Sequence, residues 1–267
     1  GLRIENTNQG YALRFPRDVD PTGRQKYTDF LPSLHIKRML TDQMNLRFSY
    51  ARAINRPSFF EIVPYSIINE EYKEKGNPRL KHTVADNIDL RWEFFPKASE
   101  QFMAGLFYKH LENPIEYGLI NEGQDTYYMP VNMGDADNMG AEIDILKYFS
   151  KFGIKANYTF TYSRITTDKR TMSGNDIITI RQTRPLFGQA AHVANLSLLF
   201  KDTHNGWEAQ VTGSFISKRL ADVSNWYDND IWENDYFRME LSAEKSFRCG
   251  VSVFLKATNL LNLPMIR

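Results

Sequence analysis

The sequence lacks long apolar runs, carries almost no net charge and holds one cysteine. Hydrophobic residues make up 42% of its 267 residues, and none of their runs approaches the ~18 residues that a membrane-spanning helix needs. The lone Cys249 excludes an intramolecular disulfide and a cysteine-rich metal site. With 33 basic and 32 acidic residues, the balance argues against a nucleic-acid surface. A helical membrane protein and a nucleic-acid-binding protein are therefore not expected.

Signatures of catalysis and of cofactor binding are also missing. None of the five histidines is spaced for shared metal ligation with another histidine or with cysteine; they are His35, His82, His110, His192 and His204. The sequence contains no P-loop, zinc-protease HExxH, dinucleotide-binding glycine pattern or nucleophile elbow. We therefore predict no enzyme, no metal site and no cofactor.

What the sequence does contain is alternation of apolar and polar residues in runs of about fourteen residues. Ile88, Leu90 and Trp92 alternate with Asp89 and Arg91, which is the period of two that a β-strand imposes. Residues 154–163 and 207–215 show the same pattern. Soluble strands usually have five or six residues, whereas a tilted strand needs about 9–11 to cross a bilayer. The runs are long enough for a membrane.

We predict eleven strands, joined by connections that are alternately short and long. The strands are residues 1–6, 27–40, 43–56, 82–95, 100–113, 138–149, 152–166, 190–202, 206–219, 235–247 and 249–260. The tight turns are expected at 41–42, 96–99, 150–151, 203–205 and 248. The long connections are 7–26, 57–81, 114–137, 167–189 and 220–234.

The order of the connections places all short turns on one side of a meander and all long loops on the other. Outer-membrane barrels have this asymmetry, with short periplasmic turns and long extracellular loops, whereas compact soluble domains rarely carry several long structureless loops. We therefore predict an all-β fold, an antiparallel up-and-down transmembrane β-barrel. Single-chain bacterial barrels are closed and even-numbered, so eleven strands indicate part of a larger barrel.

Aromatic residues cluster beside the predicted short turns. Amphipathic rings are stable at the boundary between lipid and water, so the cluster predicts an aromatic belt at the periplasmic rim, in contact with outer-membrane lipid. A general preference of aromatic residues for strands is the alternative. The residues are Trp92, Phe94, Phe95, Phe149, Phe152, Phe200, Trp207 and Phe247.

Five segments, in order along the chain, resemble motifs of TonB-dependent outer-membrane receptors. Residues 50–59 (YARAINRPSF) are similar to the family's YSRxINRPSF segment, and 76–81 (GNPRLK) to GNPxLKPE, with His82 where proline is usual. Residues 105–109 (GLFYK) resemble a strand motif, and 139–143 (MGAEI) the xGxEl motif. Residues 258–262 (TNLLN) resemble the NLLN turn that precedes the last strands.

The resemblance implies a 22-stranded barrel closed by an N-terminal plug domain, with a TonB box that contacts the TonB complex. It implies active uptake of a scarce nutrient across the outer membrane of a Gram-negative bacterium. Residues 1–267 would then be the C-terminal portion of the barrel, and we expect the plug, the TonB box and the final strands to lie outside this chain. Siderophore, haem, glycan, peptide and cobalamin all remain open as cargo.

The long connection 220–234 carries the densest group of candidate ligand-binding residues. Indole rings beside carboxylates could stack on a sugar ring and accept its hydrogen bonds. The alternative is that the indoles pack the loop onto its neighbours while the acids stay in solvent. The candidates are Trp226, Tyr227, Asp228, Asp230 and Trp232.

A second aromatic and polar group lies on the connection 114–137, where Tyr127 and Tyr128 precede Asn132 and Asn138. Packing within the loop is the alternative to ligand binding. Arg56 lies where a strand leaves the membrane; it could contact an anionic ligand or a plug carboxylate, or could be structural.

Charged and amide residues on the polar faces of the strands are expected to line the interior, because charge is tolerated at membrane depth only when it faces water or protein. They would offer partners to the plug. A barrel with another role, such as an enzyme or adhesin, and a soluble β-rich binding module are the alternatives. The residues are Arg47, Asn87, Asp89, Arg91, Glu93, Asn157, Thr159, Thr161, Glu208, Gln210, Arg238, Glu240 and Glu244.

Overall fold

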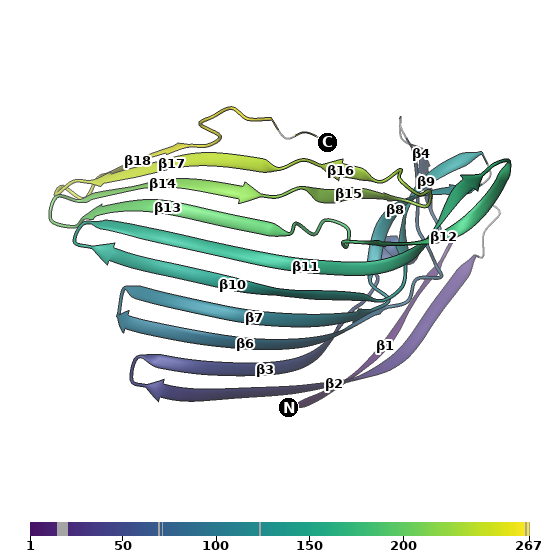
Figure 1. The fold of residues 1–267 in the computed structure, drawn as a ribbon, viewed down its shortest axis with the longest axis horizontal. Helices are drawn as coiled ribbons and strands as arrows, with labels where there is room; N and C mark the ends of the chain where they lie inside the picture. The colour runs from purple at the N-terminus through teal and green to yellow at the C-terminus, as the bar shows by residue number, and fades with distance from the viewer. Residues whose placement is uncertain (15–20, 69, 71, 123, 265, 267) are drawn as a thin grey trace.

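The computed structural model describes residues 1–14, 21–68, 70, 72–122, 124–264 and 266. One large antiparallel sheet forms most of the molecule, and a smaller sheet is gathered at one end (Figure 1). Within the described ranges, no helix is long and apolar enough to span a membrane.

The large sheet follows chain order from β1 to β18 (Figure 1). Its path comprises β1 (Leu2–Ala12), β2 (Thr22–Thr41), β3 (Met44–Asn55), β6 (Thr83–Lys97), β7 (Glu100–Glu112), β10 (Ala136–Phe149), β11 (Phe152–Ser173), β13 (His192–Asp202), β14 (Trp207–Ile216), β17 (Tyr236–Ser246) and β18 (Ser252–Ala257). A twelfth strand, β12 (Asp176–Arg184), pairs with β11 beside this path.

The eleven predicted strands and the five short turns are confirmed, and the turns lie together at one end (Figure 1). The sheet is strongly curved but not closed: among the described strands, β1 pairs only with β2, and β18 only with β17. Backbone groups of an open edge cannot remain unpaired in lipid. Further strands are therefore needed to complete a membrane barrel.

The prediction that the long connections lack regular structure is wrong. The connection 7–26 extends β1 and β2, and 167–189 holds the end of β11 and a further strand, β12. The other three connections form a second sheet in the order β16-β15-β8-β9-β5-β4. Its strands are β4 (Ser66–Ile68), β5 (Lys73–Lys75), β8 (Ile115–Glu122), β9 (Asp125–Asn132), β15 (Arg219–Ser224) and β16 (Ile231–Glu233), and a short helix, α1 (Phe59–Ile62), precedes β4. Strand β15 shows why alternation missed them: Leu220, Ala221, Asp222 and Val223 are all buried, so the strand has no solvent face to give a period of two.

The first two strands are longer than predicted, since β1 reaches Ala12 and β2 begins at Thr22. Residues 15–20 of the predicted connection lie outside the described residues. The added part of this hairpin is polar on both faces and is joined by side-chain pairs, including Arg24 Nε to Asn8 Oδ1 at 2.7 Å and Gln9 Nε2 to Gln25 Oε1 at 3.2 Å. Without an apolar face it carries no alternation to detect.

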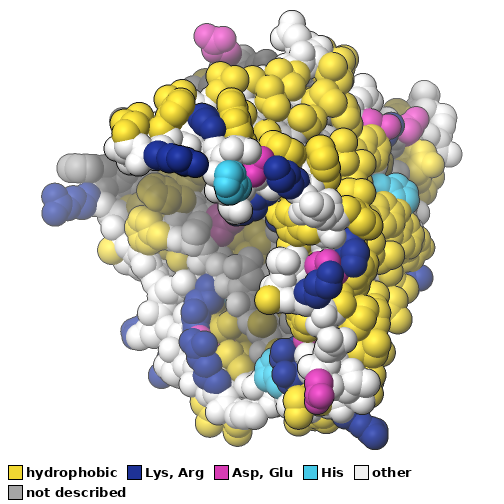
Figure 2. Space-filling model, turned by 90° about the vertical axis from the view of Figure 1, so that its left-hand side faces the viewer, with side chains coloured by type: hydrophobic (Ala, Val, Ile, Leu, Met, Phe, Trp, Pro, Cys, Tyr) yellow, Lys and Arg dark blue, Asp and Glu magenta, His cyan; other side chains and the backbone are white. Residues whose placement is uncertain are grey.

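The two faces of the large sheet differ as the alternation predicts. Phe48, Leu90 and Leu106 are cross-strand neighbours on one face, and Leu90 and Leu106 are 42% and 60% exposed. Figure 2, which looks onto the end with the short turns, shows hydrophobic side chains over much of the outside and charged ones around a hollow. The exposed apolar face is suited to lipid.

The polar face pairs many of its own charges. Arg47 Nε lies 2.7 Å from Glu93 Oε1, and Arg91 Nη2 lies 2.6 Å from Glu142 Oε1. Gly105 separates Arg91 from Glu142 in the strand register, and a Cβ there would lie 2.9 Å from Glu142 Cγ. The glycine thus lets Glu142 reach across β7. The predicted contact of this face with a plug stays a prediction.

Adjacent residues on β13 test the assignment of the faces. In the full-length protein containing this chain, Leu198→Arg should destabilise the folded barrel by about 2–4 kcal/mol if it lies near the bilayer midplane, because Leu198 is 57% exposed on the apolar face. The control Leu199→Arg faces the polar interior near Glu208 and should cost much less. Denaturant titration of the protein in liposomes measures both, and equal losses would contradict the assignment.

Candidate functional site

Three hairpins meet at the end of the molecule opposite the short turns, and they form the candidate site (Figure 1). Strand β15 pairs in parallel with β8 through Val223 and Gly118. The backbone of Arg170, on β11, pairs with Trp226. The β8–β9, β11–β12 and β15–β16 hairpins are therefore joined to one another through their backbones.

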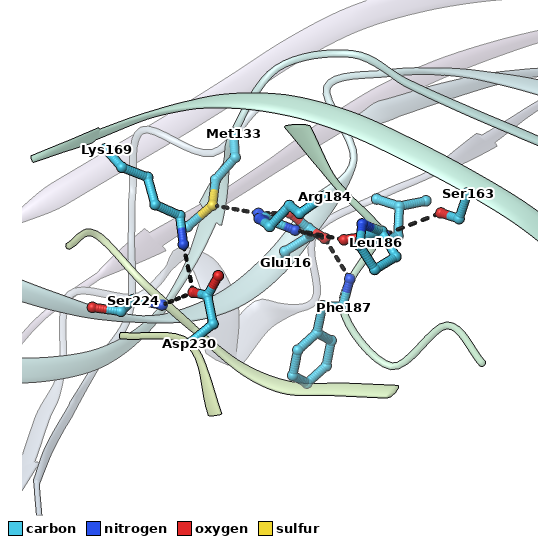
Figure 3. A network of polar contacts seen from close by, with 10 residues as sticks. Glu116, Met133, Ser163, Lys169, Arg184, Leu186, Phe187, Ser224 and Asp230 are labelled. Carbon is cyan, nitrogen blue, oxygen red and sulfur yellow. Dashed lines mark hydrogen bonds and ion pairs between the residues drawn. The ribbon is translucent and has the colours of Figure 1, made fainter. Parts of the chain in front are cut away.

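A buried ion pair fastens β8 to β12 (Figure 3). Arg184 Nη1 and Nη2 lie 3.1 and 2.7 Å from the two carboxylate oxygens of Glu116, and the two side chains are 2% and 3% exposed. The backbone N–H of Phe187 also donates to Glu116, at 2.7 Å. A two-pronged arginine–carboxylate contact fixes orientation as well as distance, so it sets how the two hairpins meet.

A second buried ion pair fastens β11 to the connection between β15 and β16 (Figure 3). Lys169 Nζ lies 2.5 Å from Asp230 Oδ1, and the side chains are 1% and 6% exposed. The backbone N–H of Ser224 donates to the same oxygen at 2.8 Å. Burial lowers the pKa of Lys169, opposed by the hydrogen bond and charge of Asp230. Asp230, predicted as a ligand contact, is thus engaged in holding the loops together.

Tyr127 and Tyr128 are adjacent on β9, so their rings lie on opposite faces of the strand, Tyr127 beside lysines of β5 and Tyr128 beside other tyrosines. Lys75 Nζ is 4.7 Å from the centre of the Tyr127 ring, a cation–π distance. The Tyr128 ring lies 5.3 Å from Tyr117 and 5.2 Å from Tyr72. Such rings and cations suit an aromatic or anionic ligand.

The Tyr117 hydroxyl donates to Glu61 Oε1 at 3.1 Å. Burial, with the charge of Glu61, raises the pKa of Tyr117. Tyr117 therefore remains a neutral donor at physiological pH.

Asparagine side chains connect β9 and the GNPRLK segment by hydrogen bonds to backbone groups. Asn132 Oδ1 accepts the N–H of Lys81 at 2.8 Å, while its Nδ2 donates to the carbonyl of Asn113 at 2.8 Å. Asn77 Nδ2 donates to the carbonyl of Pro130 at 3.0 Å. At Gly76 a Cβ would lie 1.9 Å from the Val63 carbonyl oxygen, so only glycine fits. These contacts give Asn132 a structural role.

Arg56 and His82 contact the inner face of the first hairpin. Arg56 is ion-paired with Glu5, and its Nε donates to Thr7 Oγ1 at 2.8 Å. The His82 ring stacks on Tyr27 at 3.8 Å, with Nε2 2.9 Å from Asp29 Oδ1. The histidine that departs from the motif therefore packs against β2.

The remaining candidates on the connection 225–232 are not gathered at one point. Trp226 is half-buried and its backbone N–H donates to Ser224 Oγ at 3.0 Å. Tyr227 is 47% exposed, and Asp228 is exposed at a positive φ of 58°. Trp232 is half-buried with Lys218 Nζ 4.9 Å from its ring centre. Ligand binding by these residues stays a prediction.

A cavity of about 960 Å³ lies between the β1–β2 hairpin and the second sheet. Arg24 borders it from β2, and Lys75 and Arg79 border it from the segment that ends in GNPRLK. No acidic residue is found among the lining residues that the structure describes. Arg24 bonds the neutral Asn8, and Arg79 has no ion-pair partner within the described ranges. The cavity is thus positively charged, and its size is at the upper end for small-molecule sites.

Nothing in the sequence alone singles out Arg24 or Arg79 as candidates. Both lie in predicted loop or turn, 55 residues apart in sequence, and they border one cavity only because the hairpin and the second sheet fold toward each other. The motif at 76–81 is the one sequence signal near Arg79, and it says nothing of the β1–β2 hairpin.

A curved antiparallel sheet with an apolar outside and a charged inside, and with a second sheet of loop strands at one end, defines a membrane β-barrel protein. The chain belongs to the outer membrane protein beta-barrel family, whose family model matches residues 1–263. It is therefore an outer-membrane protein of the β-barrel class. No curated protein matches the sequence.

Solved structures with the same fold include receptors for siderophores. The siderophore receptor PiuA from Acinetobacter baumannii gives a TM-score of 0.70 at 15% identity, over 99% of this chain and 36% of that one. The siderophore receptor PirA from Pseudomonas aeruginosa gives 0.61 at 15%, over 91% and 41%. The ferric enterobactin receptor PfeA from the same organism gives 0.60 at 17%, over 90% and 37%. The chain thus spans well under half of each.

The buried pair between Glu116 and Arg184 makes a measurable prediction. Arg184→Met should leave a buried carboxylate without its cation, at a cost of about 3–5 kcal/mol in local stability. Adding Glu116→Leu should recover much of that loss. The control Arg181→Met removes an exposed pair with Asp168 at 3.8 Å and should cost at most about 1 kcal/mol. Hydrogen exchange of β8 and β12 in the full-length protein reports the change. Equal effects at Arg181 and Arg184 would contradict a role of the buried ion pair in fastening β8 to β12.

Proposed function

We propose that this chain is part of the barrel of a TonB-dependent receptor that takes up a small nutrient, captured first at the loop end. The observation that carries the proposal is the charged cavity bordered by Arg24 and Arg79, on the side of the membrane opposite the short turns. The motif resemblance and the fold shared with siderophore receptors support it. A plug domain and the TonB complex would act through parts of the protein outside residues 1–267.

The charge of the cavity favours an anionic nutrient. Two guanidinium groups can each offer paired donors to a carboxylate, phosphate or catecholate oxygen. The neighbouring Tyr127 ring, with Lys75 above it, adds surface on which an aromatic group could stack. Rigid loops held by buried ion pairs would keep these groups in place before the ligand arrives.

Binding to the full-length protein in detergent tests the cavity, with a panel of ferric chelates, haem, oligosaccharides and peptides. We expect an anionic compound to bind and Arg24→Gln/Arg79→Gln to weaken it more than tenfold, about 1.4 kcal/mol. Arg181→Gln, exposed on β12 away from the cavity, is the matched control and should bind normally. A neutral ligand that is indifferent to both arginines would contradict the cavity as the capture site.

The Trp226 loop is tested separately with the same ligand. If the indoles form part of the capture site, Trp226→Ala or Trp232→Ala should weaken binding more than tenfold. If they only pack the loop, affinity stays unchanged while hydrogen exchange in β15 and β16 increases.

For the transport step, uptake of the ligand by cells expressing the protein should cease when TonB is deleted. Uptake that continues without TonB would contradict a TonB-dependent receptor.

A further inference from the structure

The outside of the large sheet carries a row of five ionisable residues, which we name the outer belt. It consists of Arg52, Asp86, His110, Asp137 and Arg164, one from each of β3, β6, β7, β10 and β11. Each is the direct cross-strand neighbour of the next. They lie on the apolar face, because Tyr50, Ile88, Tyr108, Met139 and Tyr162 follow two residues nearer the short turns on the same strands.

On β7, β10 and β11 the outer belt marks the end of the apolar band, whereas on β3 and β6 Ile54 and Val84 continue it by one more pair of residues. Below it Ile88, Tyr108 and Tyr162 are 40%, 37% and 51% exposed, as expected of side chains in contact with lipid. On β2 the last exposed apolar residue, Phe30, lies further from the short turns than the belt row, and on β13 His192 lies nearer to them. This stagger is expected where strands tilted by about 35–45° cross one horizontal membrane boundary.

Tyrosine hydroxyls beneath the outer belt donate upward into it. Tyr50 donates to Asp86 Oδ1 at 2.8 Å and Tyr108 to Asp137 Oδ1 at 2.7 Å. A tyrosine ring in the apolar band with its hydroxyl in a polar layer is typical of a membrane interface. Since the long loops are at this end, the interface is that of the outer leaflet.

Within the outer belt, the basic side chains are more exposed than the carboxylates. Asp86 accepts both Nε and Nη2 of Arg52, at 2.9 and 2.6 Å. Asp137 accepts His110 Nδ1 at 2.9 Å and Arg164 Nη2 at 3.4 Å. The Asp86 and Asp137 side chains are 23% and 22% exposed, against 39%, 38% and 55% for Arg52, His110 and Arg164. The acids orient Arg52, His110 and Arg164, which keep exposed surface on the apolar side of the sheet.

We propose that the outer belt binds the phosphate groups of outer-leaflet lipid headgroups. Guanidinium groups suit phosphate oxygens because they offer several donors in one plane, and alternate strands place Arg52, His110 and Arg164 about 10 Å apart. This contact would fix the depth of the barrel wall in the membrane. The inference depends on the outer-membrane location and is independent of the proposed nutrient uptake.

Binding of phosphate-bearing lipopolysaccharide to the full-length protein, measured by native mass spectrometry from detergent, tests the outer belt. We expect Arg52→Gln/Arg164→Gln to weaken binding about tenfold, and removal of the lipid phosphates with phosphatase to do the same to the unchanged protein. The control is Arg47→Gln/Arg91→Gln, on two of the same strands but facing the interior, and it should bind normally. The single variant Arg164→Gln removes only a 3.4 Å contact within the protein, so we expect it to fold normally. Its affinity for the lipid should fall by about half as much as that of the double variant, on a logarithmic scale.

Three results would overturn the proposal. One is unchanged affinity in both outer-belt variants, and another is an equal loss in the interior control. The third is full binding of dephosphorylated lipid. Inorganic phosphate separates a lipid site from a free-anion site: it should fail to compete at millimolar concentration, and competition at micromolar concentration would also overturn a headgroup site.

Discussion

The structure depends on the requirement that every backbone N–H and C=O within lipid is hydrogen-bonded. Antiparallel pairing from β1 to β18 satisfies this requirement strand by strand, and it forces side chains to alternate between lipid and interior. The apolar outside and the paired charges of the inside follow from that alternation. So does the unfinished state of the sheet, because the edges at β1 and β18 need partners.

Above the membrane the constraint changes, and so does the structure. Water can satisfy backbone groups there, so the chain is free to form short strands, parallel pairs and hairpins that cross one another. Order in this region comes from buried ion pairs instead: Arg184 with Glu116, and Lys169 with Asp230. Removing one partner of such a pair is costly, so the loops are held as one unit. The charged cavity borders this unit.

The sequence predicted the membrane part well and the loop end poorly, for one physical reason. Alternation such as Ile88, Asp89, Leu90, Arg91 exists because two solvents act on the two faces of a strand. Strand β15 is buried on both faces and the outer part of β1–β2 is polar on both, so neither leaves such a pattern. Glu116 and Arg184 are 68 residues apart, and no local spacing relates them. Asp230 and Asn132 were found by composition, but their contacts are structural.

The transmembrane orientation of β13 (192–202) is the most direct test of this account. Single cysteines at successive positions, with Cys249 replaced by serine, would be spin-labelled in the full-length protein in liposomes. Accessibility to oxygen should peak at Ala194, Leu196 and Leu198, and accessibility to a water-soluble nickel chelate at Asn195, Ser197 and Leu199. Uniform access of the nickel chelate along the strand, or no alternation, would contradict a lipid-facing barrel wall.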